Sequence, residues 1–296
     1  MKDLLSINNL DKDAIISLIV KAKHLKARRK FRRDLKNKNL LLMFEKPSLR
    51  TKVSFEVAIR ELSGNCYYLS KDDIGFGKRE AIKDMALVLS RYVDCCIVRT
   101  FKQEDLAEFA DAATIPVVNG LTNSEHPVQI LSDLLTIYEK TGSFNGFKVA
   151  FVGDGNNIGN SLIQSAGILG FQLSIATPKG YEPKEGPKQS ANINFYNNPK
   201  DAVKDADFVY TDVWTSMGWE DERESRKKIF SDFQINSGIL QNISKKCYIM
   251  HCLPAHRGEE ITDAVIDSEN SIVIDQAENR LHMHKAILIA VLSGIR

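Results

Sequence analysis

Short apolar runs alternate with helix-like stretches along almost the whole chain, and this alternation restricts the fold more than any other feature. Alternation of strands and helices is typical of parallel sheets that carry helices on both faces. We therefore expect an α/β fold. Strands are expected in the first half at 39–45, 65–70, 94–100 and 115–121, and in the second half at 147–154, 172–178, 193–197, 206–213, 247–254 and 271–276.

The length of 296 residues suits two such domains better than one. The stretch HPVQILSDLLTIYEKTG (126–142) predicts a long helix, and its Thr-Gly ending marks the end of the first domain. We place one domain at 1–140 and the other at 145–275, with a C-terminal helix at 278–296 that packs back on the first. The predicted fold is two doubly wound parallel-sheet domains, with the active site in the interdomain cleft.

The charge pattern gives no general reason to expect a polyanionic partner. The formal net charge is only +2, although the segment 21–38 holds ten Lys and Arg residues against one Asp. A basic run can follow phosphates, but no nucleic-acid fold signature accompanies this one. We interpret it as the solvated face of an N-terminal helix, whose buried side carries Ile15, Ile16, Leu18 and Ile19. Nucleic acid is therefore not an expected partner.

The five cysteines form neither a disulfide framework nor a zinc pattern. Their number is odd, none belongs to a CxxC pair, and Cys95 and Cys96 lie where a strand would bury them. The N-terminus lacks the apolar centre of a signal peptide, and no apolar run approaches membrane-spanning length. We therefore expect a reduced, cytoplasmic protein with no membrane partner.

Polar residues gather directly after the apolar runs in both halves. In an open parallel sheet, ligands bind at the carboxyl ends of the strands, so these segments are the candidate site. They are PSLRT (47–51), Arg99-Thr100, NGLTNSEHPVQ (119–129), GDGNNIGN (153–160), TDVWTSMGW (211–219) and HCLPAHRG (251–258).

The first of these segments has the chemistry of an anion site. A helix is expected to begin near Ser48, with Thr51 in its first turn. A helix N-terminus offers unpaired N–H groups and a partial positive charge, and Arg50 with the two hydroxyls would complete a phosphate cradle. The alternative is a plain serine cap beside a solvated Arg50 and Lys52.

The glycine-rich segment 153–159 reads G-x-G-x-x-x-G, one residue longer than the dinucleotide-binding form. The acidic residue expected after the next strand is also missing, because Pro178 and Lys179 stand there. We expect the glycines to allow a tight turn, which leaves Asn156 and Asn157 to contact a ligand.

Several other candidates are ambiguous when each is taken alone. His126 at a helix start is more often a capping or packing residue than a catalytic one, and Met217 could serve packing. Cys252 could be a buried, inert thiol. His251, Cys252 and His256 suggest zinc, but their spacing matches no common structural site.

Taken together and in this order, the segments resemble the aspartate/ornithine carbamoyltransferase family, and within it the ornithine branch. FEKPSLRTKVSFE resembles the family's S-x-R-T phosphate motif, and SEHPVQILSDLLTI resembles its H-P-x-Q segment. DGNNIGNSL, DVWTSMGWE and HCLPAHRGEEI resemble its amino-acid-substrate segments, and AENRLHMHKAIL its last helix. The S-M-G and H-C-L-P sequences are typical of the ornithine branch. The resemblance covers nearly the whole chain.

The resemblance implies transfer of the carbamoyl group of carbamoyl phosphate to the δ-amine of L-ornithine, without metal or organic cofactor. It makes 1–140 the carbamoyl-phosphate domain and 145–275 the ornithine domain. The implied catalytic residues are Arg99, His126, Asp212 and Cys252; the implied carbamoyl-phosphate ligands are Ser48, Leu49, Arg50, Thr51, Arg99, His126, Gln129, Cys252, Leu253 and Arg280; the implied ornithine ligands are Asn157, Asp212, Ser216 and Met217.

The resemblance also implies a homotrimer or a multiple of trimers, and a mobile S-M-G loop that closes over ornithine. Lys78 or Arg79 would then reach the active site of a neighbouring subunit. Two features depart from the family pattern. Leu49 replaces Thr in the phosphate motif, where the backbone N–H is what binds, and Gly75 stands where many relatives carry Gln.

Three other functions remain to be compared with this one. A carbamoyltransferase for putrescine or N-acetylornithine would share the phosphate cradle, but an intact S-M-G sequence with Asp212 favours free ornithine. A catalytically silent binding or regulatory paralogue would be expected to lack Arg50, Arg99 or His126, and all three are present. A nicotinamide-dependent dehydrogenase is disfavoured by the missing acidic residue.

Overall fold

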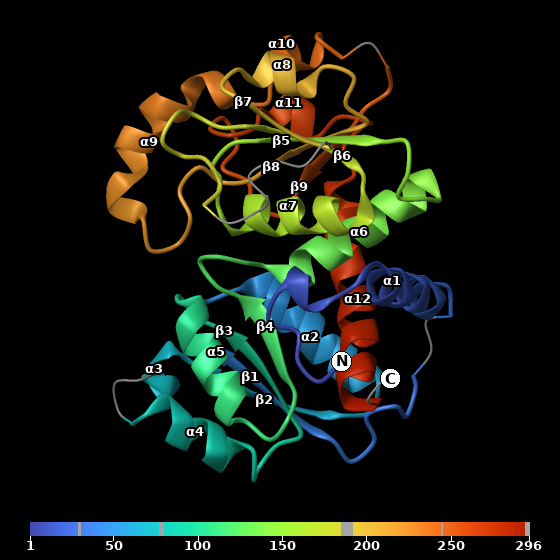
Figure 1. Ribbon diagram of the computed structural model, residues 1–296, viewed down its shortest axis with the longest axis vertical. Coiled ribbons are helices and arrows are strands. Elements are labelled where there is room, and N and C mark those ends of the chain that lie inside the picture. Colours follow the sequence, from blue (N-terminus) through green and yellow to red (C-terminus); the bar gives the residue numbers. More distant parts are fainter. Residues whose placement is uncertain (29–30, 77–79, 185–191, 244, 294–296) are drawn as a thin grey trace. The chain divides into compact units, whose positions relative to one another are not determined.

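The computed structural model describes residues 1–28, 31–76, 80–184, 192–243 and 245–293 (Figure 1). The chain divides into two compact units. Unit 1 comprises Met1–Leu135 with Glu278–Arg296, and unit 2 comprises Thr136–Ala277. Each unit is built on a sheet whose strands are all parallel, so the α/β class with two doubly wound domains is confirmed.

Unit 1 holds a four-stranded sheet in the order β2-β1-β3-β4. Its strands are β1 (Asn39–Phe44), β2 (Asn65–Ser70), β3 (Cys95–Arg99) and β4 (Val117–Leu121). Its helices begin with the short η1 (Ile7–Asn9) and continue with α1 (Lys12–Ala27), α2 (Leu49–Glu61), α3 (Lys71–Ile74), α4 (Ile82–Leu89), α5 (Gln103–Ala112) and the first part of α6 (Pro127–Thr141).

Both faces of this sheet are covered because its central strands are apolar throughout. Leu41, Met43 and Val98 point to the face on which α4 and α5 pack. Side chains alternate along a strand, so Leu40 and Leu42 point to the other face, and they are equally buried. Figure 1 shows α3, α4 and α5 on one side of the sheet and α2 on the other.

Unit 2 holds a five-stranded sheet in the order β7-β6-β5-β8-β9. Its strands are β5 (Lys148–Val152), β6 (Gln172–Ala176), β7 (Ile193–Tyr196), β8 (Phe208–Thr211) and β9 (Tyr248–His251). Its helices are α7 (Asn157–Leu169), α8 (Pro199–Val203), η2 (Glu220–Glu222), α9 (Arg223–Phe230), η3 (Ser231–Phe233), α10 (Ser237–Leu240), α11 (Asp263–Ile266) and the start of α12 (Val273–Ser293).

The two faces of the unit 2 sheet are also covered. Ala150 and Val152 of β5 belong to a core cluster with residues of α8, α10 and α11. Phe151, between them, faces the opposite side and packs against Gly159 of α7. Figure 1 shows α8, α10 and α11 on one side of the sheet and α7 on the other. The carboxyl ends of β5, β8 and β9 therefore lie next to one another at one edge.

The strand predicted at 271–276 is wrong. Only Ser271 pairs with β9, through an isolated bridge to Ile249, and helix α12 begins at Val273. The apolar, β-branched residues of this run favour a strand, but Val273 joins the core of unit 2 from the first turn of a helix. Gln276 explains the difference, because its side chain accepts the backbone N–H of His251 at 2.9 Å in place of a strand partner.

The interpretation of the basic segment is confirmed only in part, because α1 ends at Ala27 and residues 31–38 lie in turns and coil after the helix. Ile15, Leu18 and Ile19 are buried on one side of α1, while Ile16 is only half-buried. The described lysines and arginines between 21 and 38 are exposed or half-buried.

All five cysteines are free thiols, and Cys95 and Cys96 are buried in β3 as predicted. Burial raises the pKa of the Cys96 thiol to about 12, and burial together with Glu56 raises that of Cys66 to about 12. These two thiols are neutral at physiological pH, so neither is a nucleophile.

Candidate functional site

The structure gathers most of the predicted site residues into two groups, one in each unit. The first group lies in unit 1, and we call it the arginine cluster. Its members come from the ends of three strands or the segments just after them, from α6 and from α12. They are the first turn of α2 with its cap (48–51), Arg99, His126, Gln129 and Arg280.

Helix α2 begins as the sequence predicted. Ser48 is its N-cap in extended conformation, and its hydroxyl oxygen accepts the backbone N–H of Thr51 at 3.3 Å. The Ser48 hydroxyl also donates to Thr51 Oγ1 at 3.0 Å, so the two hydroxyls of the motif face each other. Leu49 between them is 75% exposed, which shows that its side chain has no packing role in the chain as described. What position 49 supplies is its backbone N–H, in the first turn of a helix.

Arg280 connects this turn to helix α6. It is 3% exposed, and its two terminal nitrogens donate to Thr51 Oγ1 at 2.7 Å and to Gln129 Oε1 at 2.6 Å. Gln129 in turn donates through Nε2 to Asp133 Oδ1 at 2.8 Å. The amide of Gln129 therefore turns its carbonyl oxygen toward the cluster, which is the acceptor that an NH2 group of a ligand would need.

His126 stands immediately before α6, and Arg99 is the last residue of β3. Both side chains are buried. Burial holds the pKa of His126 well below its ordinary value, and the positive charges of Arg280 and Arg99 lower it further. The imidazole is therefore neutral at physiological pH, while the two guanidinium groups keep their charge. A neutral imidazole among buried arginines can donate a hydrogen bond to an oxyanion without being titrated.

Two residues of this region escaped the sequence analysis. Lys46 lies just before the α2 cap and is buried, with Nζ bonded to Asn123 Oδ1 and placed over the Phe101 ring at 4.6 Å. His284, one turn after Arg280 on α12, lies 3.1 Å from Ser54 Oγ through Nδ1. The available signals were a lysine two residues after a buried strand and a histidine four residues after a site arginine.

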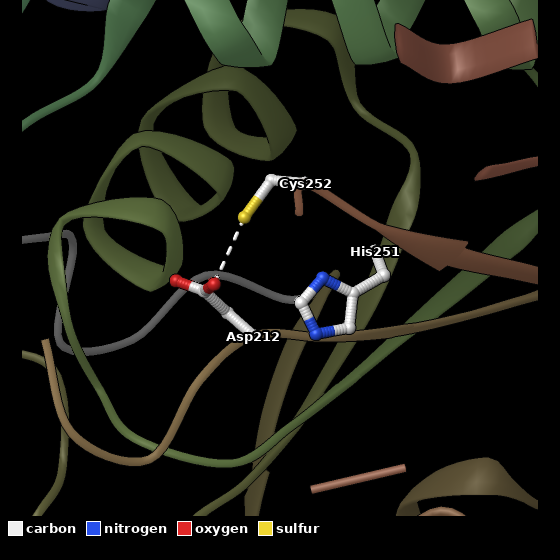
Figure 2. A group of neighbouring side chains, drawn as sticks. All are labelled: Asp212, His251 and Cys252. Carbon is white, nitrogen blue, oxygen red and sulfur yellow. Dashed lines mark hydrogen bonds between the residues drawn. The ribbon is translucent and has the colours of Figure 1, made fainter. Parts of the chain in front are cut away.

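The second group lies in unit 2, and we call it the carboxylate cluster: Asp154, Asn156, Asp212 and Cys252. Asp212 directly follows β8 and Cys252 directly follows β9, and these strands pair in register. Figure 2 shows the Cys252 thiol turned toward the Asp212 carboxylate, with Sγ donating to Oδ1 at 2.9 Å. The other carboxylate oxygen accepts Asn156 Nδ2 at 2.8 Å.

The loop between β5 and α7 supplies Asn156 to this cluster. The prediction that Asn156 is left to contact a ligand is wrong, because its side chain caps α7 at Ile158 N and also holds Asp212. Asn157 follows as the first residue of the helix and is half-buried. Gly155 is required here by close packing, since a Cβ at this position would lie 2.3 Å from Pro183 N.

Ser216 and Met217 stand on the segment after Asp212. A turn closes at Trp219, whose N–H donates to the Ser216 carbonyl oxygen at 3.1 Å, and Gly218 takes a positive φ of 98°. Met217 is 39% exposed. Within the described residues no hydrogen bond joins the Ser216 or Met217 side chains to Asp212. Ser216 and Met217 therefore follow Asp212 closely in the sequence, but in the structure they lie on a separate turn.

Asp212, Cys252 and His251 lie close enough to hold a metal ion, yet the hydrogen bonds of His251 oppose this. His251 Nδ1 accepts the backbone N–H of Leu253 at 2.9 Å, so Nε2 carries the proton and faces Glu260 Oε1 at 3.0 Å. Neither ring nitrogen has a lone pair left for a metal. The histidine instead fixes Leu253, which has a φ of 58°, uncommon for a residue with a side chain.

The predicted cross-subunit residues Lys78 and Arg79 lie outside the described residues. Gly75 just before them is described, and it ends α3 in the left-handed conformation, with φ 54°. The left-handed conformation favours glycine, which explains why position 75 carries glycine in this chain.

Two doubly wound sheets, each with polar residues at the carboxyl ends of its strands, define an α/β protein that binds small ligands. Two family models match this chain, and both describe domains of the same family. The model described as "Aspartate/ornithine carbamoyltransferase, carbamoyl-P binding domain" matches residues 2–139, and "Aspartate/ornithine carbamoyltransferase, Asp/Orn binding domain" matches 145–291. The chain belongs to the aspartate/ornithine carbamoyltransferase family.

Individual relatives are similar over their full length. An ornithine carbamoyltransferase of Archaeoglobus fulgidus is 48% identical over 300 residues, which cover 99% of this chain and 98% of the relative. The solved ornithine carbamoyltransferase of Pyrococcus furiosus superposes with a TM-score of 0.94 at 44% identity, covering 100% of this chain and 98% of that one. The Thermus thermophilus structure gives 0.92 at 43% identity, with 99% of each chain covered.

None of the helices among the described residues combines the length and apolarity needed to cross a membrane.

Proposed function

We propose that this protein is an ornithine carbamoyltransferase, which transfers the carbamoyl group of carbamoyl phosphate to the δ-amine of L-ornithine. The products are L-citrulline and phosphate, in a reaction of arginine metabolism. The observation that carries the proposal is the opposite charge of the two clusters. Unit 1 buries two arginines around a helix N-terminus and suits the anionic donor, and unit 2 places a carboxylate beside a thiol and suits the amine.

The phosphate group would bind at the first turn of α2. Ser48, Arg50, Thr51 and the backbone N–H of Leu49 are its ligands in this proposal. Helix N-termini bind phosphate because their N–H groups are unpaired and carry partial positive charge. The Ser48 and Thr51 hydroxyls already face each other across the turn, which presents both to one ligand.

The carbamoyl oxygen would become an oxyanion held by Thr51, His126 and Arg99. The lowered pKa of His126 supports this role, because the neutral ring donates one hydrogen bond and leaves the charge to the arginines. Gln129 would accept the carbamoyl NH2 group, and Arg280 keeps Gln129 and Thr51 oriented. Loss of one such donor typically costs about a hundred- to a thousandfold in rate.

The amine of ornithine would bind at the carboxylate cluster, with Asp212 and Cys252 orienting it. Asn157, Asp212, Ser216 and Met217 would hold the α-amino and α-carboxylate groups. The free alkylammonium has a pKa near 10, so it must lose a proton before it attacks. The Cys252 thiol donates a hydrogen bond to the Asp212 carboxylate. It therefore carries its own proton and is not the base in this arrangement. The ammonium loses its first proton to solvent before it attacks. The new N–C bond then replaces the C–O bond to phosphate, and the departing phosphate takes the second proton from the attacking nitrogen.

Further parts of the proposal rest on the family alone. We propose a homotrimer or a multiple of trimers, in which Lys78 or Arg79 reaches a neighbouring subunit. The Ser216–Met217 segment would close over ornithine once carbamoyl phosphate is bound. Cys252 and Leu253 would also contact carbamoyl phosphate. We place the enzyme in the cytoplasm, without nucleic-acid or membrane partners.

The test is citrulline formation from carbamoyl phosphate and ornithine, with putrescine, N-acetylornithine and aspartate as parallel acceptors. Ornithine-selective turnover that collapses in Arg50→Ala supports the function and the phosphate cradle together. Turnover with another acceptor would keep the cradle and overturn the assignment of unit 2. Absence of turnover with every amine, in protein that still binds carbamoyl phosphate, would identify a silent paralogue instead.

A further inference from the structure

Helix α9 of unit 2 carries a buried arginine that the proposed reaction does not use. Arg226 is 8% exposed, although arginine side chains usually remain in solvent. Its Nε donates to Glu222 Oε2 at 2.9 Å, and its Nη1 donates to Asp154 Oδ2 at 3.0 Å and to the Trp214 carbonyl oxygen at 2.9 Å. A guanidinium group buried with three acceptors is a fixed structural point.

This guanidinium holds both ends of the segment that carries Ser216 and Met217. At one end it binds the carbonyl oxygen of Trp214, and at the other it lies 5.8 Å from the centre of the Trp219 ring. The Trp214 side chain is held as well, because Phe230, one turn after Arg226 on α9, stacks on it at 5.9 Å. The exposed turn between the two tryptophans is therefore clamped at its base.

The same guanidinium ties this segment to the loops around it. Asp154 belongs to the loop that begins α7 at Asn157, and the Asp212 charge acts on Asp154 electrostatically. The centre of the Tyr181 ring lies 5.0 Å from the guanidinium carbon. Tyr181 belongs to the loop that packs on Gly155, so Arg226 contacts this loop as well. One side chain thus sets the distance between the turn and the carboxylate cluster.

We propose that Arg226 is a positioning residue for the amino-acid substrate: it fixes the 214–219 turn relative to the carboxylate cluster, so that Ser216 and Met217 can meet the α-amino and α-carboxylate groups. Arg226 itself contacts no substrate. The inference rests on the proposed function and deepens it, because it assigns the selection of an α-amino acid over a plain diamine to this clamp.

The experiment compares Arg226→Met with Arg223→Met in steady-state kinetics. Arg223 is the matched control, since it lies on the same helix but forms a surface ion pair with Glu259 at 2.6 Å. For Arg226→Met we expect the KM for ornithine to rise about ten- to a hundredfold, the range for losing hydrogen bonds to a charged group. The KM for carbamoyl phosphate should stay within about twofold, as should all constants of Arg223→Met.

A second measurement separates positioning from general damage. The inhibition constant of 2-aminopentanoate, an ornithine analogue without the δ-amine, should rise in Arg226→Met as much as the KM for ornithine. Putrescine lacks the α-carboxylate, so its turnover and its inhibition of the enzyme, measured in parallel, should be the same in Arg226→Met as in wild type. Arg226→Lys keeps the charge but not the fork of donors, and it should restore only part of the affinity.

If Arg226→Met does not fold, Trp219→Leu tests the same clamp from its exposed end, where the side chain is 46% exposed. It should raise both the ornithine KM and the analogue's inhibition constant severalfold. Unchanged analogue binding in a folded Arg226 variant, or in Trp219→Leu, would overturn the inference while the proposed function stands. If wild-type protein forms no citrulline, the proposed function fails first and this inference falls with it.

Discussion

The arginine cluster of unit 1 and the carboxylate cluster of unit 2 both stand at the carboxyl ends of parallel strands, but they differ in charge and in support. In the arginine cluster, the side chains of Arg99, His126, Gln129 and Arg280 are buried, and Arg280 of α12 bonds to α2 and α6 at once. The carboxylate cluster is fixed at Asp212, whereas its predicted substrate contacts Ser216 and Met217 lie on a turn.

This difference indicates which of the two clusters has its side chains in position before the substrate binds. An anionic donor can bind to groups that already have their final positions, which is the arrangement that stabilises developing charge at least cost. The amine acceptor meets a region with one fixed carboxylate and a turn clamped at its base by Arg226. We therefore expect substitutions in unit 1 to affect the chemical step, and those in the turn of unit 2 to affect recognition of the amino acid.

The largest effect is expected when the arginine cluster loses Arg280. Arg280→Met removes the donor to Thr51 and Gln129 and should lower kcat/KM for carbamoyl phosphate about a thousandfold, the upper range for one such group. Lys285→Met is the matched control, because Lys285 is a buried cation on the same helix that pairs with Glu61 at 2.7 Å, outside the cluster. Equal losses in both variants would reduce Arg280 to a structural residue.

The next effect is expected in the carboxylate cluster. Asp212→Asn keeps the shape but removes the charge that faces the amine, and it should lower kcat/KM for ornithine about a hundredfold. Binding of carbamoyl phosphate alone should be unchanged. The exposed Asp232→Asn serves as control and should behave as wild type. A loss of carbamoyl-phosphate binding in Asp212→Asn would break the division of labour between the units.

A third effect concerns stability rather than rate. Burial raises the pKa of Asp154 to about 6 despite the opposing charge of Arg226. A carboxyl whose pKa is higher folded than unfolded contributes stability that is complete below the unfolded value and is lost as the pH rises through the folded value. Wild type should therefore lose about 2–3 kcal/mol of unfolding free energy relative to Asp154→Asn between about pH 4 and pH 7.

Urea unfolding of both proteins at several pH values measures this difference. A difference that does not vary with pH would show that Asp154 titrates in its ordinary range. The result bears on the comparison, because it measures whether a buried carboxyl in the loops of unit 2 lowers the stability of the fold at neutral pH.

The smallest effect is expected for the thiol. Cys252→Ser keeps a donor for Asp212, so kcat should fall less than about tenfold if the departing phosphate takes the proton. Cys66→Ser, in the edge strand of unit 1, controls for loss of a thiol elsewhere. A fall of several hundredfold confined to Cys252→Ser would instead make the thiol the proton acceptor.

Much of the fold was accessible from the sequence because it depends on local patterns. Alternating strands and helices predicted the parallel sheets, and Ser48 predicted the start of α2, since a cap acts on its own first turn. The strand predicted at 271–276 is wrong because its β-branched residues favour a strand locally, whereas Gln276 bonds to β9 from a helix. Local preference is overridden where such a contact exists.

The site was predicted less completely, for a physical reason. Motifs name residues that touch a substrate, whereas the residues that hold them act across long separations in sequence. Arg226 lies 72 positions from Asp154, and His284 lies 230 from Ser54, so no spacing rule connects either pair. Asn156 illustrates the same limit, because its side chain binds Asp212 rather than remaining available for a ligand.

The most direct test of the account is calorimetric binding of carbamoyl phosphate, in the absence of ornithine, to wild type, Arg50→Ala and Asp212→Asn. We predict that Arg50→Ala loses binding by about a hundredfold or more, the range for losing charged contacts to a phosphate, while Asp212→Asn binds as wild type does. Binding that survives in Arg50→Ala, or that is lost equally in Asp212→Asn, would contradict the assignment of the anion site to unit 1.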